Sequence, residues 1–249
     1  MSLLMDVDVI GDKIDPQANW SSLQDAEGKR KINVGIFGKS GCGKTHFCLT
    51  APEPIFVIDT EIGTPLLRDQ FKDKDVTVIP ISPIEIRDGY EDILNNVDIL
   101  LKKAQKGEVG TIVIDSVSDL WDFTQNYAKD KIWKIKPEDK LKFQFDWGTI
   151  NRLYKNIISR LMTAECNVIL AARAAEEYDG AGKAMGTYTG KWQKDTPYNL
   201  DFVLEMKRTT KQGNASFFAY IDKSRVKGKE LIGKKMDSPT WDTFAEILK

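Results

Sequence analysis

Residues 32–45, with the sequence INVGIFGKSGCGKT, decide the fold of this chain. The apolar run at 32–37 predicts a buried strand, and the glycine-rich segment after it completes the pattern G-x-x-x-x-G-K-T. Glycines let backbone N–H groups approach a phosphate closely, and the helix that follows points its positive end at the same place. Strand, glycine turn and helix in this order predict a phosphate-binding loop. A nucleoside triphosphate is therefore the first ligand to expect.

The end of the motif carries the most specific chemistry. We expect Lys44 to reach the β- and γ-phosphates and the hydroxyl of Thr45 to hold Mg²⁺, so the predicted cofactors are ATP and Mg²⁺. His46, the single histidine, has no partner cluster, which favours packing over catalysis. The residues expected to surround the nucleotide are Gly38, Lys39, Ser40, Gly41, Cys42, Gly43, Lys44, Thr45 and His46.

The composition is that of an ordinary globular protein. The 249 residues are 41% hydrophobic and 29% charged, which predicts one domain at 31–249 preceded by an arm at 1–30. The apolar stretches have the length of strands, and the first residues do not form a leader, so we expect a cytoplasmic protein. Cys42, Cys48 and Cys166 have no metal-ligand spacing, as expected in a reducing compartment.

Strand-like and helix-like segments alternate along the chain. This order predicts an α/β fold with a mostly parallel central sheet flanked by helices, and the last two strands are expected to form a C-terminal antiparallel pair around Gln212-Gly213-Asn214. Two long helices and a short final helix show the corresponding apolar spacing. The predicted strands are 32–37, 55–58, 76–79, 111–114, 168–172, 202–206 and 217–221, and the helices are 90–106, 150–161 and 241–248.

Carboxylates follow two of the predicted strands. Asp115 ends an apolar strand in the manner of a Walker B element, whose carboxylate orients the magnesium shell. Glu61 and Asp59 end the second strand at the same edge, so Glu61 is a candidate general base while Asp59 braces the loop. Arg173 ends a third strand, as a candidate sensor of the γ-phosphate. The alternatives are solvated loop acids and a surface arginine.

These motifs together resemble the core of the RecA recombinases. The resemblance consists of the phosphate loop, Asp59-Thr60-Glu61, the stretch at 112–117 and Lys223-Ser224-Arg225, and it covers residues 32–226. The compact layout, including residues 168–178, is more closely similar to the Sak single-strand-annealing proteins of phages and archaeal viruses. The resemblance implies a RecA-like P-loop NTPase core.

The resemblance also implies how subunits share the nucleotide. Glu61 is expected to be the catalytic glutamate, and Lys223 and Arg225 are expected to reach the γ-phosphate bound by a neighbouring subunit of a homo-oligomeric filament or ring. The alternative for the two cations is a solvated strand end in a lysine-rich region. The expected catalytic set is Lys44, Glu61, Asp115, Lys223 and Arg225.

Two basic intervals match the positions of DNA-binding loops in RecA-like proteins. Both 129–142 and 178–197 have the composition of loops, with lysines to meet phosphates and aromatic rings to stack on bases. A substrate lid or a surface loop is the alternative. The candidate residues are Lys131, Lys134, Lys183, Tyr188, Lys191, Trp192 and Lys194.

The leading functional hypothesis is an ATPase that assembles on single-stranded DNA and is stimulated by it, in phage or viral recombination, annealing or replication. Three alternatives share the nucleotide core: a packaging or helicase-like motor, a nucleotide-gated DNA-binding module with little turnover, and a small-molecule kinase. The kinase predicts phosphoryl transfer without DNA, and the binding module predicts that Glu61 has no effect on hydrolysis.

Overall fold

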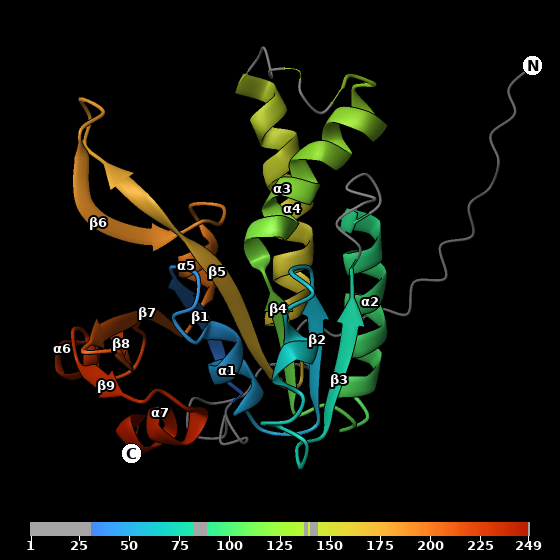
Figure 1. The fold of residues 1–249 in the computed structure, drawn as a ribbon. Helices are drawn as coiled ribbons and strands as arrows, with labels where there is room; N and C mark the ends of the chain where they lie inside the picture. The colour runs from blue at the N-terminus through green and yellow to red at the C-terminus, as the bar shows by residue number, and fades with distance from the viewer. Residues whose placement is uncertain (1–30, 82–88, 137–138, 140–143, 249) are drawn as a thin grey trace, which may run out of the picture. The chain divides into compact units, whose positions relative to one another are not determined.

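Nine strands among the described residues form one sheet (Figure 1). This computed structural model describes residues 31–81, 89–136, 139 and 144–248, so the predicted arm at 1–30 lies outside them. The strand order is β3-β2-β4-β5-β1-β7-β8-β9, and β6 pairs with β5. Six neighbouring strands run parallel: β3 (Val76–Pro80), β2 (Ile55–Asp59), β4 (Thr111–Asp115), β5 (Asn167–Tyr178), β1 (Asn33–Gly38) and β7 (Phe202–Lys211).

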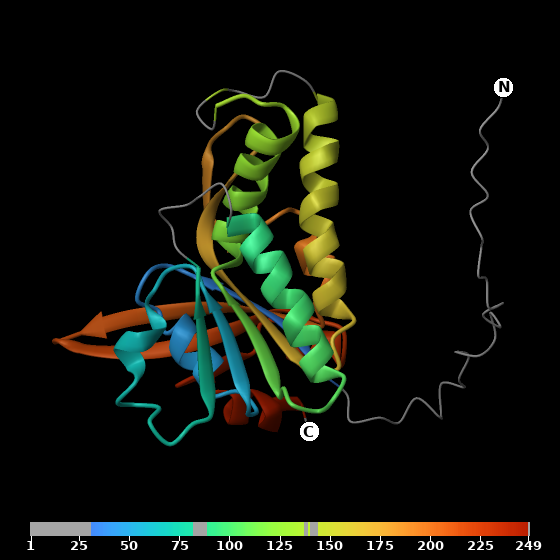
Figure 2. The same cartoon turned by 90° about the vertical axis from the view of Figure 1, so that its right-hand side faces the viewer.

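Helices cover both faces of this sheet, as the strands' apolar composition requires. The strands alternate between two cores: Ile112 and Ile114 of β4 face one, and Val113 faces the other. Figure 2 shows α2 (Gly89–Ala104) and α4 (Gln144–Met162) on the first side, with α3 (Val117–Tyr127), while α1 (Lys44–Leu49) and α7 (Trp241–Leu248) pack on the second. The predicted α/β class with a mostly parallel sheet flanked by helices is confirmed. None of the described helices could span a membrane.

The predicted C-terminal antiparallel pair is also confirmed. β8 (Asn214–Ser224) folds back on β7 through a two-residue turn, in which Gln212 and Gly213 have φ values of 50° and 83°. Two positive φ angles are typical of the tight turns that match strand twist. The three-residue strand β9 (Lys235–Asp237) then pairs with β8. The shorter helical segments are η1 (Thr64–Leu67), η3 (Ala128–Ile132), α5 (Thr196–Asn199) and α6 (Gly228–Leu231).

The expectation of a loop at 178–197 is wrong. β5 continues to Tyr178, and β6 (Ala184–Gly190) returns antiparallel to it, so the two strands form a hairpin that projects beyond the parallel sheet (Figure 1). Asp179 closes the turn, because its Oδ1 accepts hydrogen bonds from the backbone N–H groups of Ala181 and Lys183. Two of the four glycines that indicated a loop, Gly180 and Gly182, lie in this turn, whereas the stretch 187–189 after it has the threonine and tyrosine composition of a strand.

The described part of the other basic interval is not a simple loop either. The π-helical segment η3 continues directly from α3, and residues 133–136 follow it. We call residues 128–136 the α3 extension. Residues 137–138 and 140–143 of the predicted interval lie outside the described part of the chain.

Trp192 is a core residue, which corrects its predicted role in stacking on bases. Only 8% of its surface is exposed, and its ring meets that of Phe37 edge-on at a centroid distance of 6.0 Å. Glycines make room for it: a Cβ atom built on Gly190 would lie 2.5 Å from the indole, and one on Gly35 would lie 3.1 Å from it. The ring therefore fills space between β1 and β6 and is not available to a nucleic acid.

This burial predicts the effect of removing the ring. We expect Trp192→Ala to lower the free energy of unfolding by about 3–5 kcal/mol, since it leaves a large cavity between two strands. Tyr198→Ala is the control, because Tyr198 is 75% exposed and its loss is expected to cost about 0.5 kcal/mol or less. Equal urea midpoints for Trp192→Ala and the parent protein would contradict the assignment.

Candidate nucleotide site

The carboxyl ends of the central parallel strands bring the predicted residues to one edge of the sheet. Gly38 stands beside Arg173 in the register of β1 and β5, and Asp59 stands beside Asp115 in that of β2 and β4. A cavity of about 930 Å³ opens there, a size typical of ligand sites. Its walls include every residue of the predicted phosphate loop, together with Glu61 and Arg173: Gly38, Lys39, Ser40, Gly41, Cys42, Gly43, Lys44, Thr45 and His46.

The phosphate loop has the geometry that its sequence predicts. Gly43 has a φ of 91°, a left-handed conformation that glycine adopts without strain, and α1 begins at the next residue. The buried Lys44 reaches back over the loop, where its Nζ donates to the carbonyls of Gly38 at 3.1 Å and Lys39 at 3.3 Å. An ammonium group has three donors, so one remains for a phosphate. His46 packs edge-on against Phe71 at 5.0 Å.

Thr45 and Asp115 join the loop to the predicted Walker B strand. The Thr45 hydroxyl donates to Asp115 Oδ2 at 2.7 Å, across the intervening strand β5. Burial raises the pKa of the Asp115 carboxyl to about 6, against the lowering effect of the Thr45 hydrogen bond, while the charge of Glu61 raises it further. Asp115 Oδ1 is buried and has no hydrogen-bond partner in the described structure. A hydroxyl beside an unpaired carboxylate oxygen fits Mg²⁺.

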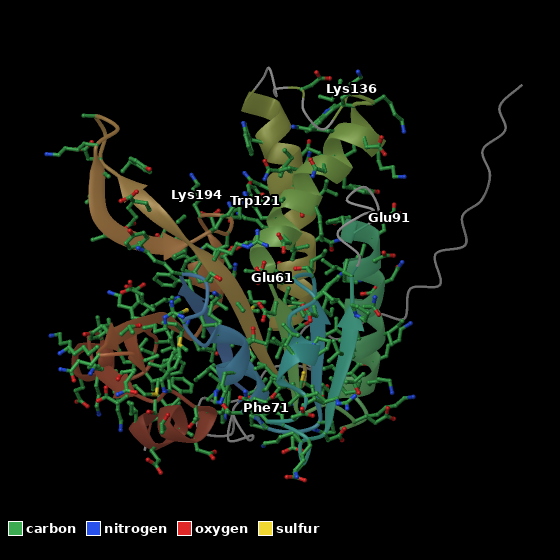
Figure 3. All side chains as sticks on the ribbon, in the orientation of Figure 1. Glu61, Phe71, Glu91, Trp121, Lys136 and Lys194 are labelled. Carbon is green, nitrogen blue, oxygen red and sulfur yellow. The ribbon has the colours of Figure 1, made fainter. Side chains whose placement is uncertain are left out.

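Glu61 is held by a network of charged and polar groups (Figure 3). Its Oε1 accepts from Arg173 Nε at 2.8 Å, and Arg173 Nη2 donates to Asp119 Oδ2 at 2.8 Å. The same Asp119 oxygen accepts from Thr60 Oγ1 at 2.7 Å. Asp59 braces the turn as predicted, since its two oxygens accept from the backbone N–H groups of Glu61 and Thr64.

Asp119 and Thr60 were missed by the sequence reasoning, although the sequence carries a signal for Asp119. Ser116 caps α3 by accepting a hydrogen bond from the backbone of Asp119, three residues on. Ser-x-x-Asp is the pattern of a capping box, which places an acid in the first turn after the Walker B strand. Nothing in the sequence alone indicates that this acid meets Arg173.

Lys223 and Arg225 lie at a different edge of the sheet. Lys223 pairs in register with Val203, next to Gly35 early in β1, and its Nζ donates to the carbonyls of Pro197 and Leu200. Arg225 donates to the carbonyl of Tyr198. Within one chain, both cations cap the short helix α5 and do not meet the phosphate loop, so their role toward a neighbour's nucleotide stays a prediction.

The other candidate DNA residues are spread over two regions. Lys131 and Lys134 are exposed on the α3 extension, while Lys183 is exposed at the turn of the β5–β6 hairpin. Lys191 forms an ion pair with Asp122 at 2.6 Å, and Figure 3 shows Lys194 between the hairpin and α3. Tyr188 lies under the phosphate loop's Lys39, with 4.3 Å between its ring centroid and Nζ.

A family model described as an AAA domain matches residues 30–241. The chain belongs to the AAA domain family. This AAA domain has the fold of a KaiC-like protein from the hyperthermophilic archaeon Pyrococcus horikoshii OT3, whose crystal structure matches with a TM-score of 0.50 and 15% identity over 83% of this chain and 84% of that one.

At that identity the likeness shows the fold alone. In all, 285 chains of solved structures match, so the fold selects no single activity. A comparison with curated proteins finds no match. The AAA domain is therefore a P-loop ATPase with a RecA-like core, and its family implies a nucleotide and usually Mg²⁺.

The buried Asp115 carboxylate predicts a stability cost that depends on pH. A pKa of about 6 in the folded protein, against about 3.9 in the unfolded chain, corresponds to about 3 kcal/mol of stability lost at neutral pH. Because the pKa is raised on folding, the loss of stability is absent below the pKa of the unfolded chain and complete above the pKa of the folded protein. Without divalent cations, we expect Asp115→Asn to unfold at a higher temperature than the parent protein at pH 7.5, and the gain to fall by about half at pH 5.

Asp69→Asn is the control for this comparison, because the Asp69 side chain is 99% exposed and its charge is screened by water. The account of Asp115 fails if Asp115→Asn lowers the melting temperature at pH 7.5, or if its effect is the same at both pH values.

Proposed function

We propose that the chain is an ATP-hydrolysing protein, related to the Sak-type annealing proteins, that assembles on single-stranded DNA in phage or viral recombination, annealing or replication. One contact carries the proposal: Lys39 of the phosphate loop lies over the ring of Tyr188 on the β5–β6 hairpin. The resemblance assigns this part of the chain to DNA. A nucleotide that reorders the phosphate loop therefore acts directly on the DNA-binding hairpin.

Hydrolysis is assigned to Glu61. Its carboxylate lies on the cavity wall with Lys44 and Thr45, and two backbone hydrogen bonds that Asp59 accepts fix the turn that carries it. A carboxylate beside the phosphate site is suited to accept a proton from the attacking water. Arg173 holds Glu61 and lines the same cavity, so a γ-phosphate that attracts the guanidinium also releases the carboxylate.

Assembly places each nucleotide between two subunits. Support comes from Lys223 and Arg225, two cations near one another at an edge of the sheet away from the chain's own phosphate loop. Burial, followed by the charge of Arg225, lowers the pKa of Lys223, as expected where two cations are close together. A neighbour's triphosphate offers Lys223 a stronger partner than the carbonyl groups of α5, and it offers Arg225 a second anion beside Asp201, with which Arg225 pairs at 3.6 Å.

The surface assigned to DNA combines the α3 extension with residues 191–194. Both carry exposed lysines, which contact phosphates without sequence preference. The hairpin itself carries exposed carboxylates at Glu176, Glu177 and Asp179, so its contribution is the exposed ring of Tyr178, which can stack on a base. Trp192 has no part in this surface.

Glu61→Gln tests the assignment of hydrolysis. We expect the variant to bind ATP with the affinity of the parent protein and to release phosphate at least about 100-fold more slowly, because the amide cannot accept a proton. Glu108→Gln, at an exposed ion pair with Lys103, is expected to keep full activity. Unchanged phosphate release by Glu61→Gln would exclude Glu61 as the base and favour a binding module with little turnover.

The charge-reversing double variant Lys134→Glu/Lys194→Glu tests the DNA surface. We expect it to bind fluorescent oligo-dT at least about tenfold more weakly than the parent protein at low salt, with a shallower salt dependence, since phosphate contacts are lost. ATP affinity is expected to stay constant. Lys102→Glu, on the exposed side of α2, is the control. Equal oligo-dT affinities for the double variant and the control would remove this surface from the proposal.

A further inference from the structure

The β7–β8 hairpin forms a second wall of the nucleotide cavity. Arg208 of β7 pairs directly with Phe217 of β8, and directly opposed residues of antiparallel strands point to the same face. Met206, two residues before Arg208, shares that face and is buried in the core with Phe47 of α1. Arg208 therefore lies on the side of the sheet that carries the phosphate loop, and both Met206 and Phe217 line the cavity.

The guanidinium of Arg208 lies against the phosphate loop itself. A Cβ atom built on Gly41, which has a φ of 70°, would stand 2.9 Å from Nη1 of Arg208 and 3.6 Å from its Cζ. The cation also acts on the neighbouring Cys42: burial raises the pKa of this thiol, and the charges of Lys44 and Arg208 oppose the rise. The positive charge of Arg208 thus acts on a group inside the phosphate loop.

The side chain of Arg208 has no hydrogen bond or ion pair with any described residue, in contrast to those of Lys207, Lys223 and Arg225. Lys207 pairs with Glu205 at 2.9 Å, and Lys223 and Arg225 donate to backbone carbonyls. A guanidinium offers five donors in a planar fork that matches phosphate oxygens. The phosphate loop beside Arg208 therefore has a guanidinium whose donors are available to a phosphate chain.

Phe217 provides a different surface at the same wall. Phe217 is 39% exposed, so its ring is accessible from the cavity, and its Cδ1 lies 3.5 Å from a Cβ atom built on Gly43. The cavity continues past Phe217 to Pro239, in the segment before α7. An exposed ring with a proline near it offers the flat apolar walls that suit a purine base.

We propose that the β7–β8 hairpin completes the nucleotide site, with Arg208 binding the phosphate chain and Phe217 stacking on the base. The proposal rests on the proposed function, because it requires that the cavity take a nucleoside triphosphate. It assigns two neighbouring side chains of one wall to the phosphate chain and to the base, in the same chain that provides the phosphate loop.

The test is a calorimetric titration of the full chain with ATP and, separately, with inorganic tripolyphosphate, which has no base. We expect Arg208→Ala to bind both ligands at least about tenfold more weakly than the parent protein, and Arg208→Lys to bind both at intermediate strength. Phe217→Ala is expected to lose affinity for ATP and to keep that for tripolyphosphate. Lys207→Ala, a cation of the same strand on the opposite face, is expected to bind both normally.

Far-ultraviolet circular dichroism checks that each variant is folded before its binding is interpreted. Parent-like binding by Arg208→Ala overturns its assignment, and equal losses of ATP and tripolyphosphate in Phe217→Ala overturn the base site. Should Phe217→Ala fail to fold, Phe217→Leu replaces it with the same expectations. Failure of the parent protein to bind ATP contradicts the proposed function itself. Equal ATP affinities of the parent protein and Arg208→Ala contradict only this inference.

Discussion

The hydrogen bond between Thr45 and Asp115 is the contact on which the site depends. It joins the phosphate loop after β1 to the end of β4 across the intervening β5, so the loop and the acid keep one geometry only while the parallel register holds. The same contact takes a carboxylate out of water and leaves one of its oxygens unpaired. The fold therefore buries a carboxylate at a cost in stability, at the position where the Mg²⁺ that the family implies would neutralise it.

Two lines of contact lead outward from this edge of the sheet. Arg173 links Glu61 to Asp119 at the start of α3, and Lys191 continues toward the same helix through Asp122. The second line is the contact of Lys39 with Tyr188 on the β5–β6 hairpin. The start of α3 and the β5–β6 hairpin are thus one or two side chains from the nucleotide cavity. A ligand that moves the phosphate loop or Arg173 changes the partners of both.

The sequence predicts the centre of the parallel sheet well, because strands such as β4 are buried on both faces and read as continuous apolar runs. Glu61 and Asp115 follow from the same logic, since strand ends meet at one edge. The hairpin of β5 and β6 was missed because glycines in its turn resemble those of a loop, and Trp192 was misplaced because Gly35, one of the two glycines that make room for its ring, is distant along the chain. Arg208 carries no motif: only the register of β7 beside β1 brings it to Gly41.

We infer that the converging strand ends form one site for ATP with Mg²⁺. Calorimetry of ATP binding to the parent protein and to Lys44→Ala, each with Mg²⁺ and with a chelator, tests it most directly. The account predicts ATP binding by the parent protein that is strengthened by Mg²⁺, and no detectable binding by Lys44→Ala under either condition. Lys44→Ala binding ATP as tightly as the parent protein would contradict the account.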